Sequence, residues 1–324
     1  MLYPLKFKPV FKDKIWGGQK IRTSLGLDFS PLPNCGEAWA LSGVSGCQTL
    51  ISNGFLEGNE LNEILEIYMD ELVGEKVYAR YSNEFPILVK FIDANDWLSI
   101  QVHPDDALAA RRKIGNGKTE MWYILDADPD AELITGFNRK MNAATYLEFL
   151  KQNRLKESLN FEKVEKGDAF FIPAGRVHAL GPGIVLAEIQ QTSDTTYRIY
   201  DWDRVDNEGK SRKLHTDLAL EAIDFSHVDS YRIKYRNVPN KPATLVDCPF
   251  FTTNLLEAGQ STIKDYSALD SFVIYVCVEG KAELSSGTAR VSLTAGEVVL
   301  LPATTEAVSL KPDPDIKILE VYIP

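Results

Sequence analysis

Two histidines with distinctive neighbours are the residues of this chain best suited to chemistry. His103 follows Gln101 by two positions, and the period-two alternation of a strand places both side chains on one face. His178 ends an apolar stretch and Pro-x-Gly turn that span residues 167–178, and Glu120 lies between the two histidines in sequence. Two imidazoles, one carboxylate and one amide oxygen can together bind one ion. A mononuclear metal site is therefore the leading hypothesis.

Composition and charge exclude one class of partner. The chain has 324 residues, enough for two domains with full cores, and its hydrophobic content of 44% is ordinary for a globular protein. The formal net charge of −11 argues against nucleic acid, because phosphate backbones need a basic face. A small anionic substrate needs only a local cluster of Lys and Arg inside a cavity. We therefore expect a small-molecule partner and no nucleic acid.

The N-terminal segment and the cysteines bear on location. Residues 1–18 carry four lysines and no uninterrupted apolar run, so they form neither a signal peptide nor a membrane span. The four cysteines show no Cys-x-x-Cys spacing and are expected to be free thiols in a reducing compartment. The sequence thus predicts a cytoplasmic protein with no membrane partner.

Short apolar or alternating segments predict the strands that must position the candidate ligands. Residues 86–103 are expected to form two apolar strands joined by a turn at 94–96. Further short strands are expected at residues 119–125, 131–137, 168–173 and 184–191. Helices are expected at residues 60–73, 142–155 and 216–223. Asn142 opens the second helix, and Thr216 is the expected cap of the third.

Strands outnumber helices, and no strand–helix–strand alternation runs through the chain. This favours a mainly β, antiparallel protein with helical insertions over a doubly wound fold. A faint internal repeat supports this interpretation, since residues 293–303 echo residues 164–174. In the second copy the position of His178 is taken by Ala307. We expect two β-barrel modules, of which only the first binds metal.

The boundary between the two modules is expected in a polar, proline-containing stretch at residues 236–242. Residues 1–238 would then form the catalytic, metal-binding module with its helical insertions. Residues 239–324 would form a degenerate C-terminal β module without ligands.

Several motifs resemble known families. The stretch at residues 167–178 resembles the second signature motif of the cupin β-barrels, in which the histidine is a metal ligand. Most of the chain, from residue 14 to about residue 225, resembles the type I phosphomannose isomerases in their short bacterial form. The motifs that carry this resemblance are Trp16-Gly17-Gly18, Gly36-Glu37-Ala38-Trp39, residues 98–104 (LSIQVHP), Lys118-Thr119-Glu120, residues 173–178 and residues 193–198 (SDTTYR).

The resemblance implies two cupin-like (jelly-roll) β-barrel modules and a zinc enzyme, with one Zn²⁺ per chain, that interconverts mannose 6-phosphate and fructose 6-phosphate. The chain departs from the general cupin pattern because Gln101 replaces the first histidine of a His-x-His pair. Glu120 also lies 17 residues after His103 instead of four or five. The phosphomannose isomerase family shares both departures, which strengthens the assignment.

Aldose–ketose isomerisation needs an acid/base group near C1 and C2 and an electrophile for the developing enediolate. The resemblance implies that Arg198 is the catalytic arginine and that Lys90 faces the site and touches substrate. Alternation places Lys118 on the face of Glu120, where it could act as acid/base group or phosphate contact. It likewise places Ser99 on the face of Gln101, where its hydroxyl could donate to phosphate.

Each residue also has a purely structural interpretation. Gln101 could make an outer hydrogen bond to a ligand, and Glu120 could be a surface acid at a strand end. Arg198 could be an ordinary surface arginine, Lys90 could extend its ammonium group to water from a strand edge, and Ser99 could have no role. Trp16 and Trp39 could wall the cavity or pack the core, and the core is favoured for both. His215 and His227 lie in a polar segment and are expected to be structural or solvated.

Two other functions compete with the isomerase. One is a non-catalytic sugar-binding or regulatory cupin. Such a protein does not require the SDTTYR motif at residues 193–198 or the lysines Lys90 and Lys118. The other is an iron-dependent cupin oxygenase, which usually has a His-rich ligand set that Gln101 does not match. Zinc together with turnover of mannose 6-phosphate would decide between the three.

Overall fold

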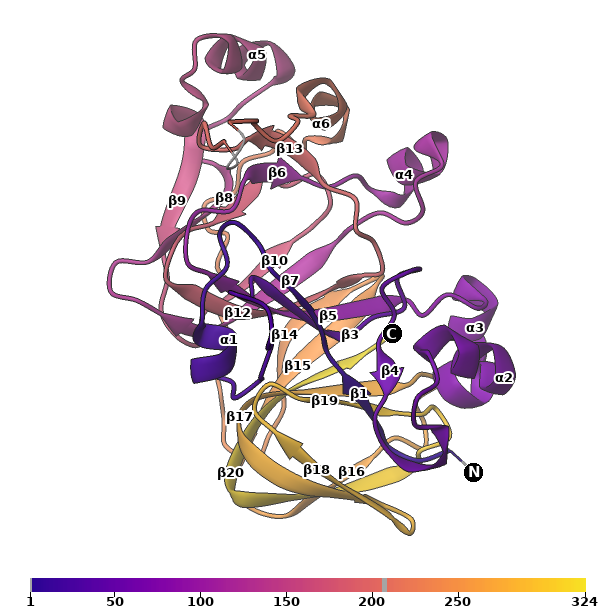
Figure 1. Cartoon of the computed structure of the whole chain (residues 1–324). Helices are drawn as coiled ribbons and strands as arrows, with labels where there is room; N and C mark the ends of the chain where they lie inside the picture. The colour runs from indigo at the N-terminus through magenta and orange to yellow at the C-terminus, as the bar shows by residue number, and fades with distance from the viewer. Residues whose placement is uncertain (1, 206–208) are drawn as a thin grey trace.

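The computed structural model describes residues 2–205 and 209–324, and it is built mainly of antiparallel β-sheet (Figure 1). The prediction of a mainly β fold with helical insertions is confirmed. Two sheets form the module that contains the candidate ligands. The six-stranded sheet has the order β10 (Ala169–Ile172), β7 (Glu120–Ala127), β12 (Ile184–Gln191), β5 (Ile87–Ala94), β3 (Glu37–Leu41), β2 (Val10–Lys12). The five-stranded sheet has the order β13 (Tyr197–Tyr200), β6 (Ile100–Val102), β11 (His178–Leu180), β8 (Glu132–Phe137), β9 (Leu159–Lys163).

A nine-stranded sheet forms most of the C-terminal part. Its main path is β14 (Ala243–Cys248), β15 (Phe251–Ala258), β20 (Ala307–Tyr322), β17 (Val273–Ser286), β19 (Val298–Leu301), β1 (Leu5–Lys8), β4 (Leu50–Ile51). Two further strands join it, β16 (Thr262–Asp265) on β20 and β18 (Ala289–Thr294) on β17. The N-terminal strand β1 thus completes the C-terminal sheet. The predicted division between residues 238 and 239 stays a prediction.

The continuous apolar runs of the central strands follow from burial on both faces. Along β12, Ile184 and Leu186 pack between the two sheets of the first module, whereas Val185 and Ala187 pack toward the C-terminal sheet. All eight residues of β12 are buried. Because neither face meets water, the alternation of polar and apolar residues expected for a half-exposed sheet disappears.

The helices cover the outside of the sheets. They are α1 (Lys20–Thr23), α2 (Leu61–Val73), α3 (Glu75–Tyr81), α4 (Asp106–Arg112), α5 (Ala143–Lys151) and α6 (Thr216–Ala222), with short 3₁₀ turns η1 (Gly54–Leu56) and η2 (Leu155–Ser158). Figure 1 shows α4, α5 and α6 at the end of the molecule opposite β16 and β18. Within the described ranges, no helix combines the length and the apolar character needed to cross a membrane.

Two details of the helix predictions are corrected. The Asn142 side chain caps α5 as predicted, accepting from the Thr145 amide at 2.9 Å. This helix ends at Lys151 instead of continuing to residue 155, because Asn153 adopts a left-handed backbone with φ of 56°. The residue at the N-cap of α6 is His215 and not Thr216.

The internal repeat is also a repeat of structure. Gly167 and Gly296 both have a positive φ, of 94° and 85°, in the turns that lead into β10 and β19. Ile172 of β10 pairs with Glu120, and the corresponding Leu301 of β19 pairs with Val273. Val273 therefore stands at the register position of Glu120, and Ala307 begins β20 as His178 begins β11.

A buried carboxylate lies in the otherwise mostly apolar interior of the C-terminal sheet. Glu320 on β20 is 2% exposed and pairs in register with Tyr275 and Asn254. Its carboxylate accepts from Tyr266 Oη at 2.5 Å and from Asn254 Nδ2 at 3.1 Å. It also forms an ion pair with Lys264 at 2.9 Å. The group is thereby fully partnered.

Candidate active site

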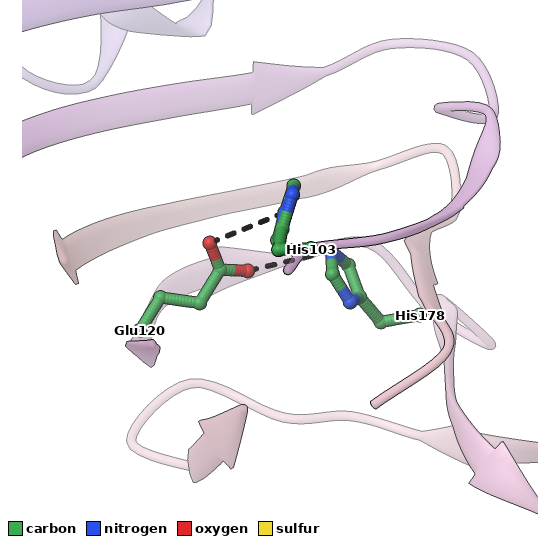
Figure 2. Close-up of side chains that lie close together, drawn as sticks. All are labelled: His103, Glu120 and His178. Carbon is green, nitrogen blue, oxygen red and sulfur yellow. Dashed lines mark ion pairs between the residues drawn. The ribbon is translucent and has the colours of Figure 1, made fainter. Parts of the chain in front are cut away.

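Three candidate ligands converge from three separate strands. Glu120 begins β7, His178 begins β11, and His103 follows the end of β6 (Figure 2). All three are at most 1% exposed, and their potential ligand atoms lie within 4.8 Å of one another. His103 Nε2 lies 3.6 Å from Glu120 Oε2, and His178 Nε2 lies 3.4 Å from Glu120 Oε1. The structure thus brings residues 103, 120 and 178 to one buried point.

Hydrogen bonds fix which nitrogen of each ring faces this point. His103 Nδ1–H donates to the Thr195 carbonyl at 2.9 Å, and His178 Nδ1–H donates to the Arg176 carbonyl at 2.8 Å. Since a carbonyl can only accept, each neutral ring keeps its lone pair on Nε2. Burial lowers the pKa of His103 well below its usual range and that of His178 to about 4. Both rings are therefore neutral imidazoles near neutral pH.

The convergence point has unsatisfied acceptors. Glu120 Oε1 and His178 Nε2 are buried, and no hydrogen-bond partner for either occurs in the described part of the chain. The Lys118 ammonium lies 2.9 Å from Glu120 Oε2 and 3.1 Å from His103 Nε2. Burial raises the pKa of Glu120. Buried acceptors without donors are unfavourable unless a cation binds them, so this donor set fits a divalent metal.

Gln101 lies beside this cluster. It pairs in register with His178 on one side and with Arg198 on the other, and its side chain is half-buried. It lines the adjoining cavity. The structure places Gln101 next to one proposed ligand, and its own coordination of the metal stays a prediction.

A polar cavity of about 300 Å³ adjoins the cluster. All four of the other predicted site residues line it: Lys90, Ser99, Lys118 and Arg198. Trp16 also lines it, whereas Trp39 is fully buried in the core, where its indole N–H donates to Glu37 Oε2 at 2.8 Å. Other lining residues were not predicted as site residues: Lys14, Glu37, Glu188, Asp194, Thr196 and Arg212.

Glu188 is one functional candidate that the sequence analysis missed. It is 3% exposed, and its carboxylate accepts from Lys90 Nζ at 3.0 Å and from Trp122 Nε1 at 2.9 Å. Lys90 Nζ also donates to Gln190 Oε1 at 2.8 Å. The sequence contained a signal for Glu188, because it is a charged residue within an apolar strand, as Lys90 is.

The electrostatics of the Lys90–Glu188 pair keep both groups charged. Burial alone would raise the pKa of Glu188, but Lys90 and Lys118 outweigh it and lower that pKa to about 2. Burial alone would lower the pKa of Lys90, but Glu188 and Glu37 outweigh it and raise that pKa. The pair is thus a fixed ionic element of the cavity wall.

Arg198 is positioned at the cavity by hydrogen bonds from its backbone amide and its side chain to the segment before α6. Its Nη1 donates to the Lys213 carbonyl at 2.9 Å, and its amide donates to His215 Nδ1 at 3.1 Å. Its Nε is buried without a hydrogen-bond partner among residues 2–205 and 209–324. Burial lowers the pKa of Arg198, and the neighbouring Arg212 lowers it further. His215 therefore supports Arg198, in keeping with its expected structural role.

Comparisons with known proteins agree with this architecture. Residues 4–143 match the family model "Phosphomannose isomerase type I, catalytic domain", and residues 241–322 match "Mannose-6-phosphate isomerase, cupin domain". The chain is 37% identical to mannose-6-phosphate isomerase ManA of Bacillus subtilis (strain 168), over 92% of this chain and 93% of that protein. It is 33% identical to mannose-6-phosphate isomerase of Streptococcus mutans, over 98% of both chains.

Solved structures show the same similarity. The crystal structure of mannose 6-phosphate isomerase from Bacillus subtilis superposes with a TM-score of 0.88 at 32% identity, over 99% of both chains. A variant of phosphomannose isomerase from Salmonella typhimurium superposes with a TM-score of 0.79 at 19% identity, also over 99% of both chains. The second likeness concerns the fold alone.

Proposed function

Because the chain belongs to the type I phosphomannose isomerase family, we propose that mannose 6-phosphate and fructose 6-phosphate interconvert in the cavity described above. The enzyme is an aldose–ketose isomerase, and the proposal concerns where and how it acts. One observation carries it, namely that three buried ligand atoms converge beside a cavity that also presents Lys118 and Arg198. Isomerisation needs this combination of groups, whereas binding alone does not.

We propose zinc as the metal, bound once per chain. His103 and His178 would bind it through Nε2 and Glu120 through its carboxylate, with the amide oxygen of Gln101 as the fourth ligand. The unpartnered acceptors at Glu120 and His178 support this assignment. When bound, the ion would act as a Lewis acid toward oxygens of the substrate. Residues 1–238 would form this catalytic module and residues 239–324 the module without ligands.

Lys118 is proposed to move protons. The residue is 5% exposed and lines the cavity, and its ammonium group lies 2.9 Å from Glu120 Oε2, which fixes its position. A proton held at Lys118 Nζ can be exchanged with a substrate oxygen as the carbonyl and hydroxyl groups of C1 and C2 change places. The low exposure of this corner excludes bulk water from that exchange.

Arg198 is proposed to stabilise the enediolate. It lies across the strand pair from Gln101, so its guanidinium group faces the same side of the sheet as the proposed ligands. Its unpartnered Nε and its permanent charge suit it to negative charge that develops during the reaction. Lys90 and Ser99 line the same wall and are proposed to contact the substrate.

We also propose that the enzyme works in the cytoplasm. All four of its cysteines, Cys35, Cys47, Cys248 and Cys277, are free thiols, as a reducing compartment would keep them. Fractionation of the native host with an antibody to this chain would test the location.

The experiment that tests the function combines elemental analysis with a coupled assay. We expect the purified chain to contain one equivalent of zinc and to convert mannose 6-phosphate to fructose 6-phosphate. A chelator should remove both the metal and the activity, and added zinc should restore them. A chain that binds zinc and mannose 6-phosphate without turnover would instead be a sugar-binding or regulatory cupin, and the proposal would be wrong.

A further inference from the structure

Resting on the proposed function, we infer that Arg212 binds the phosphate group of the substrate. Arg212 lies in the segment between β13 and α6 and lines the cavity together with Arg198 and Gln101. Its sequence neighbourhood carries no strand or helix periodicity, and only the folded chain brings it to the site.

One edge of the Arg212 guanidinium group is already occupied. Its Nε donates to Asp201 Oδ2 at 2.7 Å and its Nη2 donates to Asp201 Oδ1 at 2.5 Å. Asp201 is 5% exposed and also accepts from Arg204 Nη2 at 2.7 Å, so the acceptor is itself fixed. No described residue pairs with Arg212 Nη1. The guanidinium group is thus oriented, with one edge left for an anion.

The charges of the cavity favour an anion at this end. Three of its lysines are paired with acids: Lys14 with Glu37 at 3.3 Å, Lys90 with Glu188 at 3.0 Å and Lys118 with Glu120 at 2.9 Å. By contrast, Arg198 has no carboxylate at ion-pair distance among the described residues, and Arg212 lies close enough to lower its pKa. Five basic residues line the cavity against the three acids Glu37, Glu188 and Asp194, so positive charge is in excess. A phosphate dianion would compensate it.

The order of residues along the wall suits a sugar phosphate. Arg198 lies beside Gln101 in the strand register, and its Nη1 holds the Lys213 carbonyl at 2.9 Å. That contact fixes the segment of Arg212 next to β13. His178, Gln101 and Arg198 are therefore neighbours in the strand register, and Arg198 in turn contacts the segment that carries Arg212. A hexose phosphate lying along this wall has C1 and C2 near the proposed ligands and its phosphate at Arg212.

The test compares phosphorylated and unphosphorylated ligands in Arg212→Gln. We expect KM for mannose 6-phosphate and the dissociation constant for inorganic phosphate to rise about tenfold to a hundredfold, the loss typical of charge-assisted hydrogen bonds. The kcat, the metal content and the KM for unphosphorylated mannose should stay within about threefold. Arg212→Lys, which keeps the charge and loses the planar group, should recover only part of the affinity. Arg290→Gln, at an exposed position on β18, is the matched control for charge and should change nothing.

Asp201→Asn tests the positioning role of the acceptor. It should raise KM for mannose 6-phosphate with little change in kcat, because it loosens Arg212 without touching the reacting carbons. An Arg212→Gln variant with unchanged phosphate affinity, or with equal losses for both sugars, would overturn the inference. Failure of the wild type to isomerise mannose 6-phosphate would overturn the proposed function. The phosphate-binding comparison would still decide the role of Arg212 in that case.

Discussion

Replacement of Lys90 by methionine should destabilise the enzyme strongly. The variant leaves the Glu188 carboxylate buried, and Trp122 is then its only hydrogen-bond donor within residues 2–205 and 209–324. Glu188 has a pKa of about 2, against 4.5 for an ordinary glutamate, and this difference corresponds to about 3 kcal/mol. Loss of one partner from a buried ion pair typically costs about 3–5 kcal/mol. Both figures predict a large decrease in the free energy of unfolding.

The assay is urea unfolding of the wild type, Lys90→Met, Glu188→Gln and the double variant. The double variant should be more stable than Lys90→Met, because no uncompensated carboxylate remains. Lys163→Met is the control, since Lys163 pairs with Asp130 on the surface and that pair should contribute nothing measurable. If Lys90→Met were as stable as this control, or if the double variant were no better than Lys90→Met, the argument from a buried pair would be wrong.

The remaining predictions concern pH, metal and catalysis. Because the folded protein lowers the pKa of Glu188, the contribution of its carboxylate to stability is complete above pH 4.5 and is lost as pH falls through about 2. The difference in free energy of unfolding between the wild type and Glu188→Gln should therefore shrink over that interval. His178→Ala should lose metal and activity while circular dichroism shows an intact fold. The control His227→Ala should keep its metal and its activity. An active, fully metallated His178→Ala would show that the site is elsewhere. Elemental analysis should find one metal per chain, because Ala307 and Val273 replace ligands in the second module; two tightly bound equivalents would contradict this. Arg198→Lys should keep zinc and a KM within about tenfold, and lose about 10²–10³ in kcat; a raised KM with unchanged kcat would make Arg198 a substrate anchor.

The features that could be predicted from the sequence depend on patterns among a few neighbouring residues. The strands around Lys90 and the cap at Asn142 could be predicted because apolar runs and capping residues act over a few positions. Gln101 and His103 could be placed on one face for the same reason. The sequence could also indicate that Lys90 needs a partner, because a charge in an apolar strand must be compensated.

The partner of Lys90 could not be predicted, because it depends on strand register. Glu188 lies 98 positions further along the chain, and only the pairing of β5 with β12 brings the two together. The place of β1 in the C-terminal sheet is equally non-local, since it pairs with β19 nearly 300 positions away. Arg212 is the hardest case, because its segment has no periodic pattern and its position depends on Arg198 and Asp201.

The buried glutamate of the C-terminal sheet has a counterpart in the first module. Glu320 pairs with Tyr275 and Asn254 in the register in which Glu188 pairs with Trp122 and Lys90. The second barrel therefore keeps an interior acid where the first has one, although the ligand positions beside it are apolar. Around Glu320 an amide, a hydroxyl and the Lys264 ammonium group take the place of the ammonium and indole groups that surround Glu188. Substitutions at Glu320 would therefore measure what a buried acid contributes to stability at a position where Val273 and Ala307 replace the residues that correspond to Glu120 and His178.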